Sequence, residues 1–385
     1  MENVFHGQAK GVLHIMKFIC NKSDLLTGVN IVLKAVPSKT TMTILECILI
    51  DTTSGGIKLM TNDMEIGIET YVAGSVEENG VIAADAKVFS EIVRRLPDNE
   101  VWIETDTSYK MYITCEKAKF VISCKSADEF PPFPVIERND CVTLSQFTLR
   151  EVIKQTIFSI SDNDSNQMMK GILFDVNRSR LKVISLDGHR VSVRNIELRD
   201  EYQPKKAIVP GKTLNEVSKI LSGETEDFVS IFFTNSHIVF EFGDTVVVSR
   251  IIEGEFFNID HLMSISTDTK VSVNKKTFIE SLDRSLLLIR ENDKKPVVFQ
   301  ITDDEMKMKL STGLGTMNEE IEVEKTGNDL TIAFNPKFML DALRVIDDET
   351  VDMYMSTAKT PCFIKDVDDT YLYLILPVNF NSMSV

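Results

Sequence analysis

The feature that most constrains the fold of this chain is a threefold internal repeat. In each copy an apolar strand end leads through a polar turn into a short helix, followed by an acidic turn and another strand; the copies are residues 82–106, 208–235 and 332–357. Lys87, Lys212 and Lys337 hold the same helix position, with 125 residues between successive members. This period is too long for a solenoid repeat and predicts three similar domains.

A second helix recurs near the start of each repeat. Apolar residues spaced by three and four predict a one-faced amphipathic helix in 21–36, 145–160 and 274–289. Alternating apolar and polar residues predict paired strands in 56–72, 171–188 and 297–313. The fold class is therefore α+β, with three repeated domains in which two helices pack on antiparallel sheets.

Two segments separate the repeats: the Pro- and Phe-rich DEFPPFPVI at 128–136 and EGEFFNIDHL at 253–262. The predicted domains span 16–136, 137–262 and 263–385. Residues 1–15 lie outside the repeats, and we interpret them as an N-terminal extension or a tag remnant.

Charge is divided unevenly along the chain. The net charge is −16, yet six helical windows together carry +8, so all other segments carry −24; the windows are 21–34, 87–95, 145–154, 212–219, 274–290 and 337–344. A basic surface would form if the helices share one side, and that surface could hold a phosphate backbone without reading bases. The basic helix residues are Lys22, Lys87, Arg94, Arg95, Arg150, Lys154, Lys212, Lys219, Lys275, Lys276, Lys337 and Arg344.

Other features of the sequence argue against several protein classes. No apolar run is long enough to span a membrane, and no signal peptide is visible, so we expect a cytoplasmic protein. The six cysteines have no zinc-ligand spacing and are interpreted as free thiols. We expect no metal and no cofactor.

The segment SLDGHR, residues 185–190, is the strongest candidate for catalysis. Asp187 and His189 suggest a hydrolase, with Arg190 binding an anionic substrate, but no recognised catalytic motif surrounds them. Asp-Gly between two strands also predicts a type I′ hairpin turn at Asp187 and Gly188. Both interpretations stay open on these residues alone, as does a triplicated scaffold that binds only peptides.

The triplicated units, the LDGHR hairpin, the EGEFFNIDHL boundary and the terminal YLILPVNF together resemble the bacterial sliding clamp family, the beta subunit of DNA polymerase III. The resemblance runs from Met16 to about Phe380. It implies a non-catalytic ring, formed by a head-to-tail homodimer, that encircles double-stranded DNA without sequence preference. Its partners would be the replicative DNA polymerase, which it makes processive, the clamp loader and other proteins with a clamp-binding motif.

The resemblance also implies specific site residues. Lys39 matches a DNA-contacting position of the family and joins the basic helix residues. Ring closure would bring Ile122 of one protomer toward Leu287 and Leu288 of the other. A hydrophobic peptide-binding cleft between the second and third domains would include Met169, Leu186, Gly188, Val191, Phe228, Phe233, Asn335, Phe338, Pro361, Leu374, Leu376, Pro377 and Val378.

Overall fold

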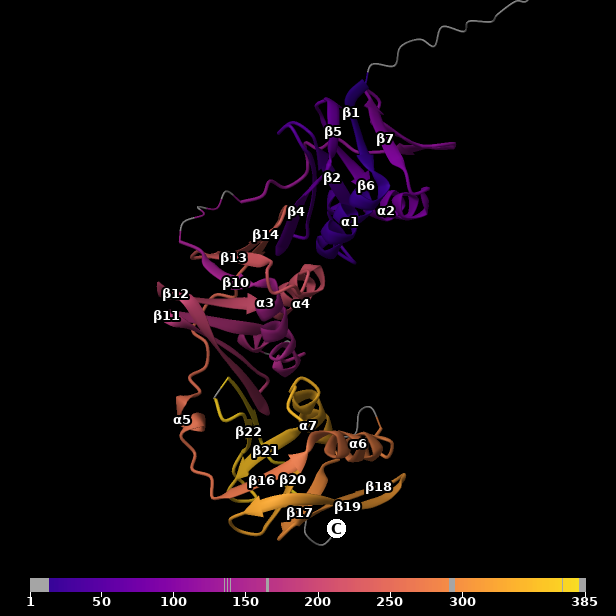
Figure 1. Ribbon diagram of the computed structural model, residues 1–385. Coiled ribbons are helices and arrows are strands. Elements are labelled where there is room, and N and C mark those ends of the chain that lie inside the picture. The colour runs from indigo at the N-terminus through magenta and orange to yellow at the C-terminus, as the bar shows by residue number, and fades with distance from the viewer. Residues whose placement is uncertain are drawn as a thin grey trace, which may run out of the picture. The chain divides into compact units, whose positions relative to one another are not determined.

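The computed structural model describes residues 14–134, 136, 138, 140–163, 166–290, 295–368 and 370–380 (Figure 1). The chain divides into two compact units. Unit one comprises 1–142 and 228–250, and unit two comprises 143–227 and 251–385. The units differ from the sequence repeats because strands of neighbouring repeats pair within each unit.

Unit one is built from antiparallel sheets and two helices. The first sheet has the order β5-β1-β7-β8-β9, and a second contains β13-β14-β15-β4-β3-β2-β6. The helices are α1 (Lys22–Val32) and α2 (Ala86–Arg95). The strands are β1 (His14–Asn21), β2 (Cys47–Asp51), β3 (Ile57–Asn62), β4 (Ile66–Val72), β5 (Gly74–Glu78), β6 (Val81–Asp85), β7 (Glu100–Asp106), β8 (Lys110–Cys115), β9 (Ala118–Ser123), β13 (Phe228–Phe233), β14 (His237–Phe242) and β15 (Thr245–Arg250), and β10 (Val142–Ser145) spans the unit boundary.

Unit two holds one ten-stranded sheet of order β11-β12-β23-β22-β21-β16-β19-β18-β17-β20. In Figure 1 its helices α3, α4, α6 and α7 lie on the same side of the unit. The helices are α3 (Gln146–Lys154), α4 (Gly211–Ile220), α5 (Asp260–Met263), α6 (Lys275–Leu286) and α7 (Pro336–Leu343). The strands are β11 (Gly171–Leu186), β12 (Arg190–Pro210), β16 (Thr269–Asn274), β17 (Val297–Thr302), β18 (Glu305–Thr312), β19 (Gly315–Thr326), β20 (Leu330–Phe334), β21 (Thr350–Met355), β22 (Cys362–Lys365) and β23 (Tyr371–Ile375).

The α+β prediction is confirmed, and four of the six repeated helices, α2, α3, α6 and α7, begin where a capping side chain satisfies a free amide. Asp85 accepts from Val88 N at the start of α2, and Asn335 accepts from Lys337 N at the start of α7. The first helix of each repeat is shorter than its apolar pattern. For example, α1 ends at Val32 and continues as a 3-10 turn. Helix α1 packs closely on the sheet at Gly28, where an added Cβ would meet Val72 at 2.6 Å.

Candidate functional site

The SLDGHR segment forms the hairpin turn between β11 and β12. Asp187 Oδ1 accepts hydrogen bonds from the amides of His189 and Arg190 at 2.9 and 3.1 Å. Gly188 has a φ of +85°, whereas neither Asp187 nor His189 is among the residues with positive φ. The predicted turn is confirmed, but its type I′ assignment is wrong, because that type needs positive φ at both central residues.

The Asp187 carboxylate is directed at Arg190, and among the described residues no acidic side chain is recorded in contact with the His189 ring. Its Oδ2 accepts from Arg190 Nε at 2.9 Å, and the exposed His189 ring stacks on Phe338 with 6.0 Å between centroids. A hydrolytic Asp-His pair needs the carboxylate to orient the imidazole. The described contacts of Asp187 do not provide that geometry.

Arg190 is buried and connects three elements of unit two. Besides Asp187, its guanidinium donates to Asp341 Oδ2 of α7 at 2.7 Å and to the carbonyl of Phe158. It also lies over the Phe338 ring, 4.4 Å from the centroid. Arg190 therefore holds the start of β12 against α7, and through the hairpin it fixes the position of Gly188.

A cavity of about 230 Å³ lies beside this hairpin. Its floor is a cross-strand row in which Leu186 pairs with Val191 and Val191 pairs with Leu374. Leu376 donates its amide to the His189 carbonyl at 2.8 Å, which holds the end of β23 against the turn. Six of the thirteen residues predicted for the peptide cleft line this cavity: Met169, Leu186, Gly188, Val191, Leu374 and Leu376.

The other predicted cleft residues lie outside the cavity lining. Asn335 and Phe338 lie at the start of α7, where Phe338 contacts Arg190 and His189. Pro361 is buried just before β22, and the amide of Val378, which follows Pro377, donates to Ala333 O at 2.8 Å. Phe228 and Phe233 lie on β13 in unit one, whereas the cavity belongs to unit two.

Sequence reasoning missed the wall that the boundary segment contributes. Phe257, Asn258, Ile259 and Leu262 line the cavity together with Arg190. The sequence identifies this segment only as a domain boundary. Ile259 is 3% exposed although it belongs to no strand, so its burial gives no periodic signal. The charge of Arg190 likewise points to an anionic substrate rather than to a buried structural role.

The repeated lysines occupy the first turn of the second helix in each repeat. Lys87, Lys212 and Lys337 are exposed there, near the positive end of the helix dipole. A cation in this position costs about 0.3–1 kcal/mol, whereas an anion bound there is favoured.

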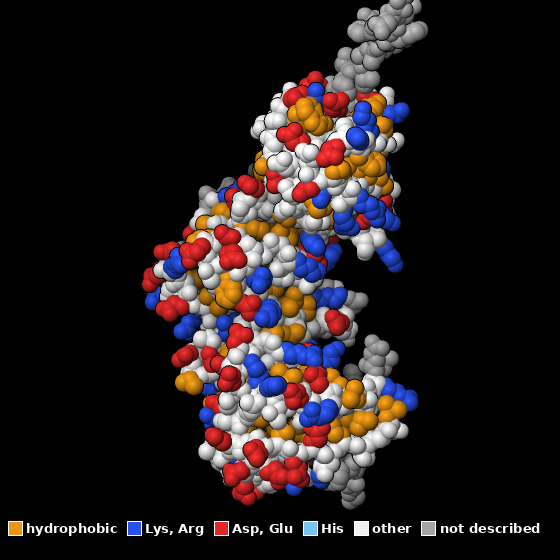
Figure 2. Space-filling model, turned by 45° about the vertical axis from the view of Figure 1, so that its right-hand side comes forward, with side chains coloured by type: hydrophobic (Ala, Val, Ile, Leu, Met, Phe, Trp, Pro, Cys, Tyr) orange, Lys and Arg blue, Asp and Glu red, His pale blue; other side chains and the backbone are white. Residues whose placement is uncertain are grey.

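The other predicted DNA-facing residues divide between exposed and ion-paired side chains. Lys39 and Lys276 are exposed. Several of the rest form ion pairs on their own helices, for example Arg94 with Glu91 at 2.6 Å and Lys219 with Glu216 at 2.8 Å. In unit two the basic helices share one side, as the charge pattern requires, and Figure 2 shows acidic side chains gathered near the lower end of the view.

Exposed apolar side chains lie on the edge strand β9 and at the end of helix α6. The edge strand β9 pairs only with β8 among the described strands, and its Phe120 and Val121 are 40% and 57% exposed. The predicted interface residue Ile122 is partly buried on the same strand. At the end of α6, Leu287 is 78% exposed, whereas Leu288 packs against the core of the third repeat.

Within the described residues, no helix has both the length and the apolar character needed to cross a membrane. In the same part of the chain, no cluster of three or more His, Cys, Asp or Glu side chains is placed to hold a metal ion. All six cysteines are free, as predicted. Burial raises the pKa of the Cys20 and Cys124 thiols to about 12, which keeps both protonated at neutral pH.

Comparison with known proteins gives consistent matches along the chain. Models of the DNA polymerase III beta subunit match its N-terminal domain at 16–134, its central domain at 143–258 and its C-terminal domain at 262–379. The beta sliding clamp of Staphylococcus aureus is 31% identical over 375 residues, which cover 94% of this chain and 99% of the relative.

Solved structures agree with these matches. The DNA polymerase sliding clamp of Bacillus subtilis aligns with a TM-score of 0.92 at 32% identity, covering 96% of this chain and all of that chain. A protein of Eubacterium rectale assigned to the DNA polymerase III beta subunits aligns with a TM-score of 0.92 at 58% identity, covering 95% of this chain and all of that one.

Proposed function

The chain belongs to the DNA polymerase III beta subunit family, the beta sliding clamps, and from this premise we propose that it forms a head-to-tail dimeric ring that encircles duplex DNA and makes the replicative polymerase processive. The beta sliding clamp is a non-catalytic subunit, so the hydrolase alternative at Asp187 and His189 is wrong. The observation that carries the proposal is the first-turn lysine that recurs in all three repeats of a chain with net charge −16.

The proposed hold on DNA is electrostatic and independent of sequence. The lysines of the repeated helices, together with Lys39, would face the phosphate backbone. Such contacts fix no base sequence and permit sliding. The acidic remainder of the chain would repel DNA from the outer surface. Because the protein would act on DNA together with the replicative polymerase, we propose that it works in the cytoplasm.

Ring closure is supported by a strand pairing that recurs within the chain. The last strand of the second repeat, β15, pairs with β4 of the first. The last strand of the third repeat, β23, pairs with β12 of the second. By the same rule β9, the last strand of the first repeat, would pair with the third repeat of a second copy. We propose that its partner is the first half of β19.

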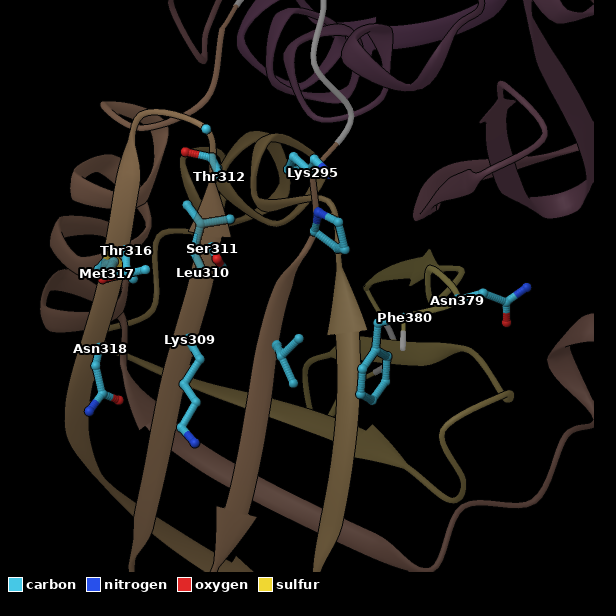
Figure 3. Close-up of a pocket in the computed structure, with 13 residues that line it drawn as sticks. Lys295, Lys309, Leu310, Ser311, Thr312, Thr316, Met317, Asn318, Asn379 and Phe380 are labelled. Carbon is cyan, nitrogen blue, oxygen red and sulfur yellow. The ribbon is translucent and has the colours of Figure 1, made fainter. Parts of the chain in front are cut away.

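The described residues leave that half of β19 available. Strand β18 pairs along β19 from Gly315 to Glu322, whereas β16 pairs only with the segment from Val323 onward. A cavity of about 740 Å³ lies beside the β18–β19 turn, bordered by Thr312, Thr316 and Asn318 and by Phe380 of the C-terminal segment (Figure 3). An open edge flanked by exposed apolar groups is typical of a protein interface.

The cavity beside the SLDGHR hairpin is the proposed docking site for the polymerase, the clamp loader and other partners. It is lined mainly by apolar side chains and holds one glycine at positive φ, features that suit the insertion of a short apolar peptide segment. Docking would supply a high effective concentration of polymerase on DNA. We also propose that the three domains meet at the predicted boundaries, residues 136 and 262.

The deciding experiment measures polymerase product length on a primed circular template, with the clamp loader, ATP and the cognate polymerase. The protein should lengthen the products, and unchanged length would refute the proposed tethering. Encirclement has a separate readout: the loaded protein should leave linear DNA by sliding off the ends and stay on closed circles. Equal loss from both templates would refute the ring.

A further inference from the structure

The first two repeats meet at a hairpin that has the same backbone design as SLDGHR. Asp63 Oδ1 accepts from the amides of Glu65 and Ile66 at 3.0 and 2.8 Å. Met64 has a φ of +77°, unusual for a residue with a side chain. The amide of Arg250, at the end of β15, donates to Glu65 O at 2.9 Å.

The corresponding atoms in unit two make the same bonds. Asp187 accepts from the amides of His189 and Arg190, Gly188 has the positive φ, and Leu376 donates its amide to His189 O. Met64 therefore corresponds to Gly188, and Arg250 corresponds to Leu376. The correspondence comes from hydrogen bonds and does not depend on similarity of the side chains.

The strands beside the two hairpins also correspond in register. Gly67 pairs with Val248 in unit one, as Val191 pairs with Leu374 in unit two. The boundary segment covers each pair. A Cβ added at Gly67 would meet the Phe133 ring at 2.6 Å, so the glycine allows that ring to lie against the strand.

Unit one has a cavity at this junction with the same volume as the peptide cleft, about 230 Å³ in each case. Met64, Phe133 and Val248 give it an apolar lining. Segment 131–134 forms one wall, as Phe257, Asn258 and Ile259 do in unit two. We define these residues as the unit-one junction pocket.

Two residues give the junction pocket a different chemistry from that of the cleft. Arg250 stands where the cleft has Leu376, is exposed, and forms no ion pair among the described residues. His237 lies opposite Arg250 on β14 and also lines the pocket. Glu65 is the one carboxylate among the lining residues, and no ion pair joins it to Arg250.

We infer that the unit-one junction pocket is a second peptide-docking site, and that it takes a segment carrying an apolar side chain next to a carboxylate. The apolar group would rest on Val248 and Phe133, and the carboxylate would pair with Arg250. This inference rests on the proposed peptide binding by the cleft of unit two, from which its repeated geometry is drawn.

Methionine methyl NMR on the full chain reads the two sites separately, because Met64 lines the junction pocket and Met169 lines the cleft. Met64→Leu and Met169→Leu assign the two signals. The probe is acetyl-Leu-Phe-Asp-amide, titrated to millimolar concentration against acetyl-Leu-Phe-Asn-amide. The Met64 signal should shift with the aspartate peptide, with about tenfold weaker binding of the asparagine peptide, as expected for loss of one charge-assisted hydrogen bond.

A pair of exchanges tests the assigned chemistry. Arg250→Leu should abolish the preference for aspartate at Met64, and Leu376→Arg should create that preference at Met169. Glu65→Gln should tighten aspartate binding, because it removes a like charge. A shift of Met169 without a shift of Met64 would overturn this inference and leave the cleft intact. No shift at either methionine would overturn both, and a Met64 shift that ignores the Arg250 exchange would overturn the carboxylate assignment.

Discussion

Replacing Arg190 with methionine should destabilise unit two far more than an ordinary surface substitution. The change removes three hydrogen bonds, to Asp187, Asp341 and the Phe158 carbonyl. The Asp187 and Asp341 side chains are 11% and 21% exposed, so two largely buried carboxylates would lose their cation. Leaving a buried charge unpaired costs about 3–5 kcal/mol, and the partial exposure of Asp341 favours about 3.

The loss should appear as a lower unfolding temperature for unit two, by roughly 10 °C, since 1 kcal/mol corresponds to about 2–4 °C in a unit of this size. Arg344→Met is the matched control, because Arg344 also lies in unit two, is 54% exposed and pairs with Asp283 at 2.7 Å. Calorimetry of both variants, with Asp341→Asn to complete a double-mutant cycle, separates the contribution of the pair. A loss from Arg190→Met no larger than that of the control, about 1 kcal/mol or less, would refute the assigned role.

Three further outcomes are expected. Leu287→Asp should convert the proposed dimer to monomer in sedimentation, whereas Val367→Asp, at 89% exposure, should leave it intact; dimerisation of both variants would exclude Leu287 from the proposed interface. Burial, with the hydrogen bond to Asp348, raises the pKa of Tyr371, so stability is full below about pH 10 and falls above it, and Tyr371→Phe should flatten that fall in alkaline unfolding curves. Replacing the first-turn lysines with glutamine, at Lys87, Lys212 and Lys337, should reduce the salt dependence of DNA binding. The slope of log affinity against log salt concentration should fall by about 0.9 for each phosphate that is no longer neutralised. An unchanged slope would mean that DNA binds elsewhere.

The sequence determined the helices of this fold better than it determined the pairing of its strands. Helix positions follow from local spacing, and α2, α4 and α7 begin and end within one residue of the predicted helical windows 87–95, 212–219 and 337–344. The pairing of β15 with β4 joins residues far apart in the chain. An alternating pattern shows which face of a strand is buried but not which strand lies beside it.

The strand residues of the proposed peptide cleft were predicted, whereas those of its irregular segment were not. Leu186, Val191 and Leu374 were assigned through the family resemblance, and the structure places them in one cross-strand row. Phe257 and Ile259 were missed, because they lie in an irregular segment whose burial depends on the strands beneath it. The charges of SLDGHR suggested catalysis, since a sequence does not show whether an arginine is exposed or buried.

The repeated junction also bears on how the proposed ring would close. A head-to-tail interface generates a closed ring only when the rotation at each junction divides a full turn evenly; otherwise it generates a filament. Six domains in a dimer would require a mean rotation of about 60° per junction. Two of every three junctions lie within the chain, where β4 and β12 pair with the last strand of the next repeat. Closure therefore depends on internal geometry as much as on the interface, and a substitution that loosens Arg190 would impair closure without touching β9 or β19.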